Sequence, residues 1–180
     1  MPNYCCTTLF AEHVTLKPVS SAYETELFRE LTAEVARYLV FQPTGDIDDT
    51  RDFIARSRME MDQGTAIKMV ILDRVSGAFL GYINLRSVDT REPGVGIWIA
   101  KPHQGKGVGK QALRAMMTWA DQNLSYDFLR YPVAAENILS RRLAESLGGV
   151  VAGTGTFRNT NGEELEEVEY RIPKGPVDRL

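Results

Sequence analysis

The sequence of 180 residues has few cysteines and histidines. Its two cysteines, Cys5 and Cys6, are adjacent, and neighbours in sequence rarely reach the separation that a disulfide bond needs. The two histidines, His13 and His103, have no useful spacing to the cysteines, so the residue types that hold zinc do not form a site. We therefore expect two reduced thiols, as in a cytoplasmic protein, and no metal.

The sequence also lacks a long apolar run and an excess of basic charge. No stretch of about 18 apolar residues exists, so we expect no membrane-spanning helix. The first six residues show no basic region followed by an apolar stretch, so we expect no secretory signal. The 21 basic and 24 acidic residues give a net charge of −3, which argues against a general nucleic-acid binder. The sequence leaves open whether the protein is a monomer or a homodimer.

What is present is typical of one globular domain. Hydrophobic residues make up 43% of the chain and charged residues 25%, which argues against disorder as a whole. A chain of this length can bury one sizeable core. We find no internal repeat and expect a single domain over 1–180, with 1–10 as a flexible or edge segment and 174–180 as a C-terminal tail.

The hydrophobic pattern predicts alternating strands and helices. We expect a first strand over 14–19 and then one helix over 20–38, because leucine and valine recur there at four-residue steps. A crossover from strand 95–99 through a helix to strand 128–133 is the place where a parallel pair is expected. The other expected helices are 48–64, 108–122 and 137–147, and the other expected strands are 67–72, 79–85, 150–157 and one ending at Ile172.

The segment 104–110, Gln-Gly-Lys-Gly-Val-Gly-Lys, combines three glycines with the start of a helix. Glycines allow the backbone to approach a ligand closely, and the first N–H groups of a helix lack partners and favour anions. The segment therefore predicts a cradle for phosphate or pyrophosphate, with Lys106, Lys110 and Arg114 adding positive charge. A flexible glycine turn is the alternative. The glycine spacing differs from the dinucleotide fingerprint and from the P-loop.

Gln104, Gly107 and Gly109 match the pattern Gln/Arg-x-x-Gly-x-Gly/Ala. At this point the chain resembles the GNAT superfamily of acetyl-CoA-dependent N-acetyltransferases, and in particular its RimJ/RimL-type members, which acetylate the N-termini of ribosomal proteins. Two further segments extend the resemblance: the strand Gly96–Ile99 before the loop, and an Asn-x-x-Ser segment at Asn137 that opens a helix ending in Leu-Gly. The order of elements agrees over nearly the whole chain.

The resemblance implies a single-domain α/β fold. It has a mixed, mostly antiparallel sheet of six to seven strands with a splayed central parallel pair, flanked by about four helices. Pro132 suits such a splay, because proline cannot donate to a ladder; an edge or bulged strand unrelated to a ligand is the alternative. We expect Tyr131 and Trp98 to be core or cleft wall.

The resemblance also implies acetyl-CoA as cosubstrate and, as acceptor, the amine of a protein N-terminus, an amino acid or a small molecule. Asn137 and Ser140 would lie near the pantetheine arm and the sulfur. Their plain alternatives are a helix N-cap for Asn137 and a surface hydroxyl for Ser140. The strand at Ile99 would pair with the pantetheine amides, and the pyrophosphate would be held by the main chain of Gln104, Gly105, Lys106, Gly107, Val108, Gly109 and Lys110.

Two positions depart from the pattern of many family members. The glutamate that acts on the amine corresponds here to Gly94, and the tyrosine that acts as acid corresponds to Ala144. We therefore assign Glu92 as a hypothetical base, with Glu136 as a second candidate, and Ser140 as the group near the sulfur. The departures leave open a catalytically weak module that binds or senses acyl-CoA. Transfer of a longer acyl group is a third alternative.

Overall fold

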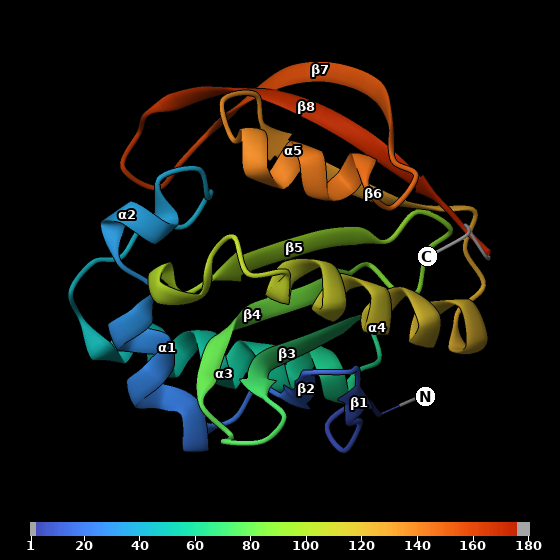
Figure 1. The fold of residues 1–180 in the computed structure, drawn as a ribbon. Coiled ribbons are helices and arrows are strands. Elements are labelled where there is room, and N and C mark those ends of the chain that lie inside the picture. Colours follow the sequence, from blue (N-terminus) through green and yellow to red (C-terminus); the bar gives the residue numbers. More distant parts are fainter. Residues whose placement is uncertain (1–2, 176–180) are drawn as a thin grey trace.

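The computed structural model describes residues 3–175, which form one mixed sheet with helices on both faces (Figure 1). The strand order is β1-β2-β3-β4-β5-β6-β8-β7, and all neighbours are antiparallel except β5 and β6. The expected α/β fold is confirmed, with one strand more than expected because β1 joins the edge. The strands are β1 (Leu9–Phe10), β2 (Val14–Pro18), β3 (Ala66–Asp73), β4 (Phe79–Arg86), β5 (Gly94–Ile99), β6 (Phe128–Ala134), β7 (Val150–Arg158) and β8 (Glu164–Pro173).

The helices follow the expected pattern except near the N-terminus. The single helix expected over 20–38 is wrong. Leu31 leaves the helical region, and the side chain of Thr32 accepts a hydrogen bond from the N–H of Val35, which starts a new helix. The four-residue periodicity cannot reveal this break, because apolar residues continue to recur every four residues across both short helices. The helices are η1 (Ser21–Tyr23), α1 (Glu24–Glu30), α2 (Ala33–Ala36), α3 (Ile47–Asp62), η2 (Lys101–His103), α4 (Val108–Asn123) and α5 (Ile138–Glu145).

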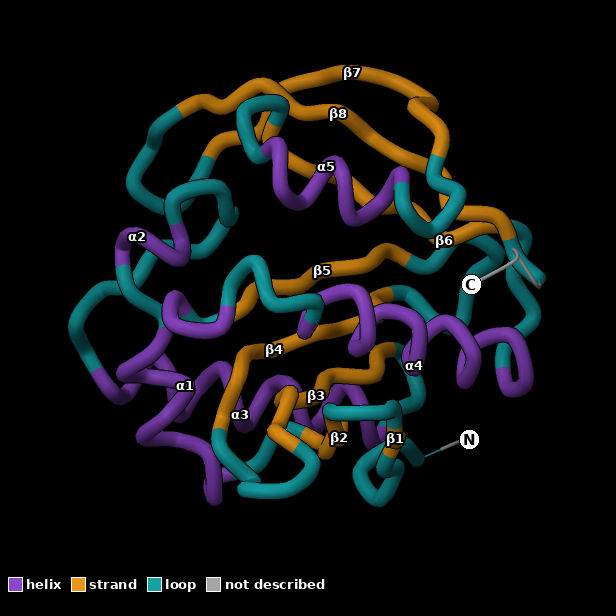
Figure 2. The backbone as a smooth tube through the Cα atoms, viewed as in Figure 1, coloured by secondary structure: helices purple, strands orange, loops and turns teal. Residues whose placement is uncertain are grey.

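The helices divide between the two faces of the sheet (Figures 1 and 2). Helix α3 packs on β3, whereas α4 packs on β2, β4 and β5 from the other side. A Cβ atom built on Gly109 of α4 would lie 3.4 Å from Cδ2 of Leu143 in α5. Helices α4 and α5 therefore lie on the same face of the sheet. From the resemblance we expect the coenzyme on the side of α4 and α5 and the acceptor on the side of α1 and α3, and we call these sides the coenzyme face and the acceptor face.

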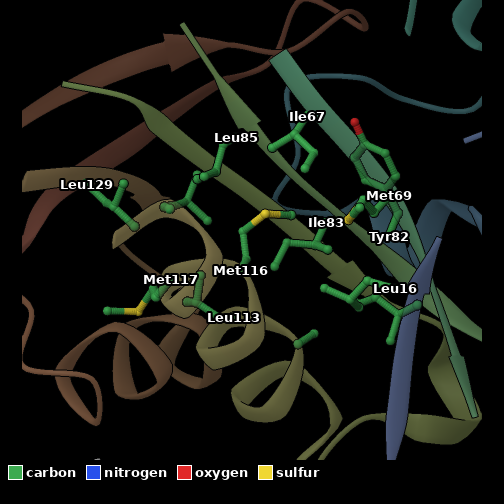
Figure 3. Packing of buried hydrophobic residues seen from close by; sticks show 14 of the residues in the cluster. Leu16, Ile67, Met69, Tyr82, Ile83, Leu85, Leu113, Met116, Met117 and Leu129 are labelled. Atoms are coloured by element: carbon green, nitrogen blue, oxygen red, sulfur yellow. The ribbon is translucent and has the colours of Figure 1, made fainter. Parts of the chain in front are cut away.

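The main core lies between α4 and the sheet. Helix α4 contributes Leu113, Met116 and Met117 to the same buried cluster as Ile83 and Leu85 of β4, and Figure 3 shows Met116 nearest to these two strand residues. All of these side chains are fully buried. Burying a large aliphatic side chain contributes about 1.5–3 kcal/mol, so this layer holds α4, and the loop before it, in a fixed position against β5.

The parallel pair of β5 and β6 separates soon after it begins. Within residues 3–175 its register pair is Gly94 with Arg130, beside a 2.8 Å hydrogen bond from the N–H of Arg130 to the carbonyl of Pro93. N–H groups alternate sides along a strand, so position 132 would direct its donor toward β5 as well, and Pro132 has none. Strand β6 nevertheless pairs with β8 along its whole length. The expected splay is therefore confirmed, and proline removes the next donor that could close it.

Near the N-terminus, Leu9–Phe10 forms an edge strand of the sheet, and Cys5 and Cys6 are free thiols. Residues 176–180 of the expected tail lie outside the described part. Within residues 3–175, no helix combines the length and apolar character needed to cross a bilayer.

Candidate active site

A cleft of about 1160 Å³ opens where β5 and β6 part. Its walls come from β4, β5, β6 and β8, and from α1, α2, α3 and the loop that joins α2 to α3. Pockets for single small molecules usually hold roughly 300–1,000 Å³. The cleft therefore has room for more than one small ligand, and it continues through the gap between the two strands.

The glycine loop before α4 presents unpaired N–H groups. Gly105 and Gly107 have φ values of +73° and +78°, and no atom lies within 4 Å of a Cβ built on either. Gly107 is the N-cap of α4 and offers no side-chain bond, so the N–H groups of 108–110 remain unpaired at the helix start. In the described chain, the N–H groups of 105–107 also have no acceptor. Free donors at the positive end of a helix fit the pyrophosphate of coenzyme A.

The side chain of Gln104 ties this loop to the end of β5. Its Nε2 donates to the carbonyl of Ile99 at 2.9 Å. The N–H of Ala100 donates to the carbonyl of Leu80 on β4, so by alternation the N–H of Ile99 points to the opposite side, toward the gap. A free strand N–H at the gap fits pairing with an amide of the pantetheine arm.

Ser140 is held by two groups on the coenzyme face. The Oδ1 atom of Asn137 accepts a hydrogen bond from the N–H of Ser140 at 3.2 Å, so Asn137 is the N-cap of α5. The hydroxyl oxygen of Tyr131 lies 2.7 Å from Oγ of Ser140. Burial raises the pKa of Tyr131 to about 12, although the hydrogen bond with Ser140 opposes this rise. Tyr131 therefore remains protonated at neutral pH.

Helix α5 is itself fixed to the sheet by a polar network. Arg141 donates from Nε to the hydroxyl of Tyr170 at 3.0 Å and from one terminal nitrogen to the carbonyl of Ala135 at 3.1 Å. The Tyr170 hydroxyl in turn donates to Glu145 at 2.7 Å. Because these bonds hold α5 to β6 and β8, the position of Ser140 relative to the gap is well defined.

Three polar residues of β4 line the cleft on the acceptor face: Tyr82, Asn84 and Arg86. The ring of Tyr82 packs edge-on against Phe53 of α3, with centroids 5.5 Å apart. The Nδ2 atom of Asn84 donates to the Tyr82 hydroxyl at 2.9 Å, whereas its Oδ1 atom is buried and has no partner in the described chain. A Cβ at Gly96 would lie 2.9 Å from Nδ2 of Asn84, so a side chain at position 96 would require this amide to shift.

Two loops that line the cleft are joined by hydrogen bonds. The N–H of Thr160, in the turn between β7 and β8, donates to the carbonyl of Val40 at 2.9 Å. The N–H of Gln42 donates to Oγ1 of Thr160, also at 2.9 Å. All three residues line the cleft. The loop between α2 and α3 and the turn between β7 and β8 therefore meet in the wall of the cleft.

The structure brings together some of the sequence-predicted site residues. Asn137 and Ser140 line the cleft, whereas Ile99 and the loop 104–110 lie outside its described lining. Glu92 is exposed, lies near Arg130 where β5 and β6 are still paired, and is absent from the cleft lining. The other carboxylate candidate, Glu136, is also absent from the lining.

Sequence reasoning missed the polar residues that face the cleft from the strands. Tyr131 was expected as wall, and its bond to Ser140 was not foreseen; Tyr82, Asn84 and Glu167 were not singled out. The alternation of side chains along β4 and β8 was the available signal. It could not say which face would meet the cleft. Residues 3–175 contain no cluster of three or more His, Cys, Asp or Glu side chains able to hold a metal.

A sheet that parts between two parallel strands, followed by a loop of free N–H groups at a helix start, defines a GNAT-type acetyltransferase. Residues 13–150 match the family model described as "Acetyltransferase (GNAT) domain". The chain therefore belongs to the GNAT acetyltransferase family and is an acetyl-CoA-dependent acetyltransferase, as the resemblance implied.

The relatives agree with this assignment. YdaF of Bacillus subtilis (strain 168), described as a candidate ribosomal N-acetyltransferase, is 28% identical over 173 residues, which are 91% of this chain and 92% of that protein. RimJ of Mycobacterium smegmatis, solved with a coenzyme A disulfide, has a TM-score of 0.85 at 18% identity, covering 96% of this chain and 90% of that one. RimL, described as a ribosomal L7/L12 α-N-protein acetyltransferase and solved with coenzyme A, has a TM-score of 0.81 at 16% identity, covering 93% and 98%.

Proposed function

We propose that this enzyme transfers the acetyl group directly to the primary amine at the N-terminus of a peptide or protein. The separation of β5 and β6 after Gly94 and Arg130 carries the proposal, because it connects the coenzyme face to the acceptor face. The size of the cleft and its many walls suit a chain better than a single small amine. The descriptions of YdaF and RimL as ribosomal acetyltransferases support the same acceptor class. The two free thiols support a cytoplasmic location.

In this proposal the coenzyme lies along β5. The main chain of 104–110 holds the pyrophosphate, with Lys106 and Lys110 contributing charge, and the N–H of Ile99 pairs with the pantetheine arm. Asn137 and Ser140 then border the arm where it passes the gap. The coenzyme supplies an activated acetyl thioester, and the protein positions the amine and manages the protons.

Ser140 is the residue that we place next to the sulfur. When the carbon–sulfur bond breaks, the thiolate needs a proton. The hydroxyl of Ser140 can give its proton to the sulfur and take up the proton that the acylated nitrogen releases, while it keeps its hydrogen bond with Tyr131. Tyr131 is suited to this supporting role because its raised pKa keeps the phenol protonated. The pair thereby replaces the tyrosine that many family members place at the position of Ala144, which is fully buried here.

A coenzyme-release assay over a panel of amines tests the proposal. The panel contains short peptides with free N-termini, free amino acids, a polyamine and an aminoglycoside. Because released coenzyme A is detected as a thiol, reactions without acceptor correct for the free thiols of Cys5 and Cys6. We expect release with peptides, and none with the same peptides acetylated at the N-terminus. Release only with small amines would contradict the peptide acceptor. Calorimetric binding of acetyl-CoA without release from any amine would identify a binding module instead.

A further inference from the structure

Glu167 of β8 lies on the acceptor face of the cleft. Tyr170 of β8 faces the coenzyme side, because its hydroxyl accepts a hydrogen bond from Arg141 of α5. Val168, two positions earlier in β8, faces the same side. Side chains alternate along a strand, so Glu167 and its register partner Ala134 project to the other face. Glu167 is part of the cleft lining.

The carboxylate of Glu167 is half-buried and free to bind a ligand. In the described chain it makes no hydrogen bond and no ion pair, whereas the neighbouring Glu169 is paired with Arg130. The charged groups near Glu167 are Glu169 on the same strand, Arg130 on β6 and Arg86 on β4. Burial is the main reason why the pKa of Glu167 is raised, with Glu169 adding to the rise and both arginines opposing it.

The other carboxylates of the lining are less suitable. Glu60 forms a 2.7 Å ion pair with the buried Lys68. Asp46 caps α3, and Asp49 accepts a hydrogen bond from the side chain of Thr44. These groups already have partners in the protein, and Asp89 is exposed in the loop after β4.

We propose that Glu167 is the catalytic base: it receives the ammonium group of the acceptor and takes up its proton. The inference rests on the proposed function. An incoming ammonium loses one proton to the Glu167 carboxylate and becomes a neutral amine. The amine nitrogen then forms a bond to the thioester carbon, the carbon–sulfur bond breaks, and the sulfur leaves with its electron pair. The second proton of the nitrogen passes to the sulfur, and Glu167 returns its proton to water.

The position of Glu167 accounts for the missing glutamate at Gly94. In the proposal the base is supplied from β8, across the gap from β5, instead of from β5 itself. A carboxylate with a raised pKa is a stronger base than an ordinary one and can take a proton more readily near neutral pH. Arg130 and Arg86 oppose this rise of the pKa of Glu167.

The test compares Glu167→Gln with Glu166→Gln, using the best peptide from the acceptor panel. Both variants remove one negative charge from β8, but Glu166 is exposed and projects to the other face. We expect Glu167→Gln to lower kcat/KM for the peptide about 100-fold at pH 7, with the KM for acetyl-CoA unchanged within about twofold. Glu166→Gln should match the wild type. Equal activity of the two variants would overturn the proposal.

The pH profile separates a base from a merely structural residue. The N-terminal amine has a pKa of about 7.7–8.0, so at about pH 9.5 the peptide arrives neutral and needs no base. We expect the defect of Glu167→Gln to shrink to less than about fivefold there. A defect of constant size from pH 6.5 to 9.5 would overturn the role. A wild-type enzyme inactive with every amine would overturn the proposed function and this role together, whereas an active wild type with an unaffected variant overturns this role alone.

The stability of Glu167→Gln supplies the control for folding. A raised pKa means that the charged form is disfavoured in the folded protein, so above that pKa the wild-type glutamate lowers stability, and below its ordinary value of 4.5 this effect is absent. We expect the thermal midpoint of Glu167→Gln at pH 7 to equal or exceed that of the wild type. A lower midpoint would indicate a structural role and contradict the assignment.

Discussion

Tyr131 and Ser140 are joined by a 2.7 Å hydrogen bond between a buried strand and the first turn of a helix. Tyr131 is 2% exposed, so the Ser140 hydroxyl has a protein partner on its inner side and the cleft on its outer side. This arrangement fixes the direction in which Ser140 can offer a proton.

The Tyr131–Ser140 pair should affect turnover more than coenzyme binding. Ser140→Ala removes the group next to the sulfur, and we expect kcat to fall about 100-fold, as for loss of a general acid. Tyr131→Phe keeps the ring in the core and removes only the partner of Ser140, so we expect a smaller fall of about tenfold. Calorimetric Kd values for acetyl-CoA should change less than about threefold. An unchanged kcat in Ser140→Ala would remove Ser140 from the chemistry.

The glycine loop should control coenzyme affinity. Gly107→Glu places a negative side chain among the free N–H groups, and we expect a Kd for acetyl-CoA at least about 50-fold weaker. Gly107 has a φ of +78°, so any side chain there is strained by about 1–2 kcal/mol. Gly107→Ala is therefore the matched control: it carries the strain without the charge and should weaken binding far less. Equal losses in both variants would contradict the pyrophosphate assignment.

Gly96 should control the acceptor side of the gap. Gly96→Ala brings a Cβ to 2.9 Å from Nδ2 of Asn84, so the Asn84 amide must shift, which strains its hydrogen bond to Tyr82. We expect the KM for the peptide to rise about tenfold, because the cleft wall changes shape there. Gly153→Ala on β7 is the control, since nothing lies within 4 Å of its Cβ. Steady-state kinetics with peptide varied at saturating acetyl-CoA measure the difference, and an unchanged KM would contradict this role of Gly96.

The break between α1 and α2 should depend on Thr32. Thr32→Ala removes the hydrogen bond to the N–H of Val35, and losing such a cap costs about 1 kcal/mol. In a chain of this size we expect the thermal midpoint to fall by about 2–4 °C. Thr32→Ser keeps the hydroxyl and should retain most of the stability. A midpoint of Thr32→Ala equal to the wild type would contradict the capping role.

The parts of the fold that depend on local chemistry could be predicted from the sequence. The glycine loop, the N-cap at Asn137 and the separation at Pro132 each follow from properties of single residues, and the structure has a free loop, a capped helix and a split sheet at these places. The helix break at Thr32 was missed because one hydroxyl outweighs a periodic apolar pattern.

The catalytic side chains were harder to predict, because they meet through tertiary structure. Glu92 lies two residues before β5 in the sequence, but β5 and β6 are still paired at that end of β5. Glu167 is 27 positions beyond Ser140, and only the pairing of β8 with β6 brings it to the gap. The register of two strands far apart in the chain cannot be read from either strand alone.

The divided sheet also makes the cosubstrate a part of the architecture. Five strands lie on one side of the split and three on the other, and the direct strand pairing between these lobes is at Gly94 and Arg130. A coenzyme bound between β5 and β6 would contact both parts of the sheet. Ligand binding to the folded state raises the free energy of unfolding by about 2.7 kcal/mol at a ligand concentration 100 times its Kd. The stability of the enzyme would thus rise with the concentration of acetyl-CoA, and the enzyme without acetyl-CoA would unfold more easily.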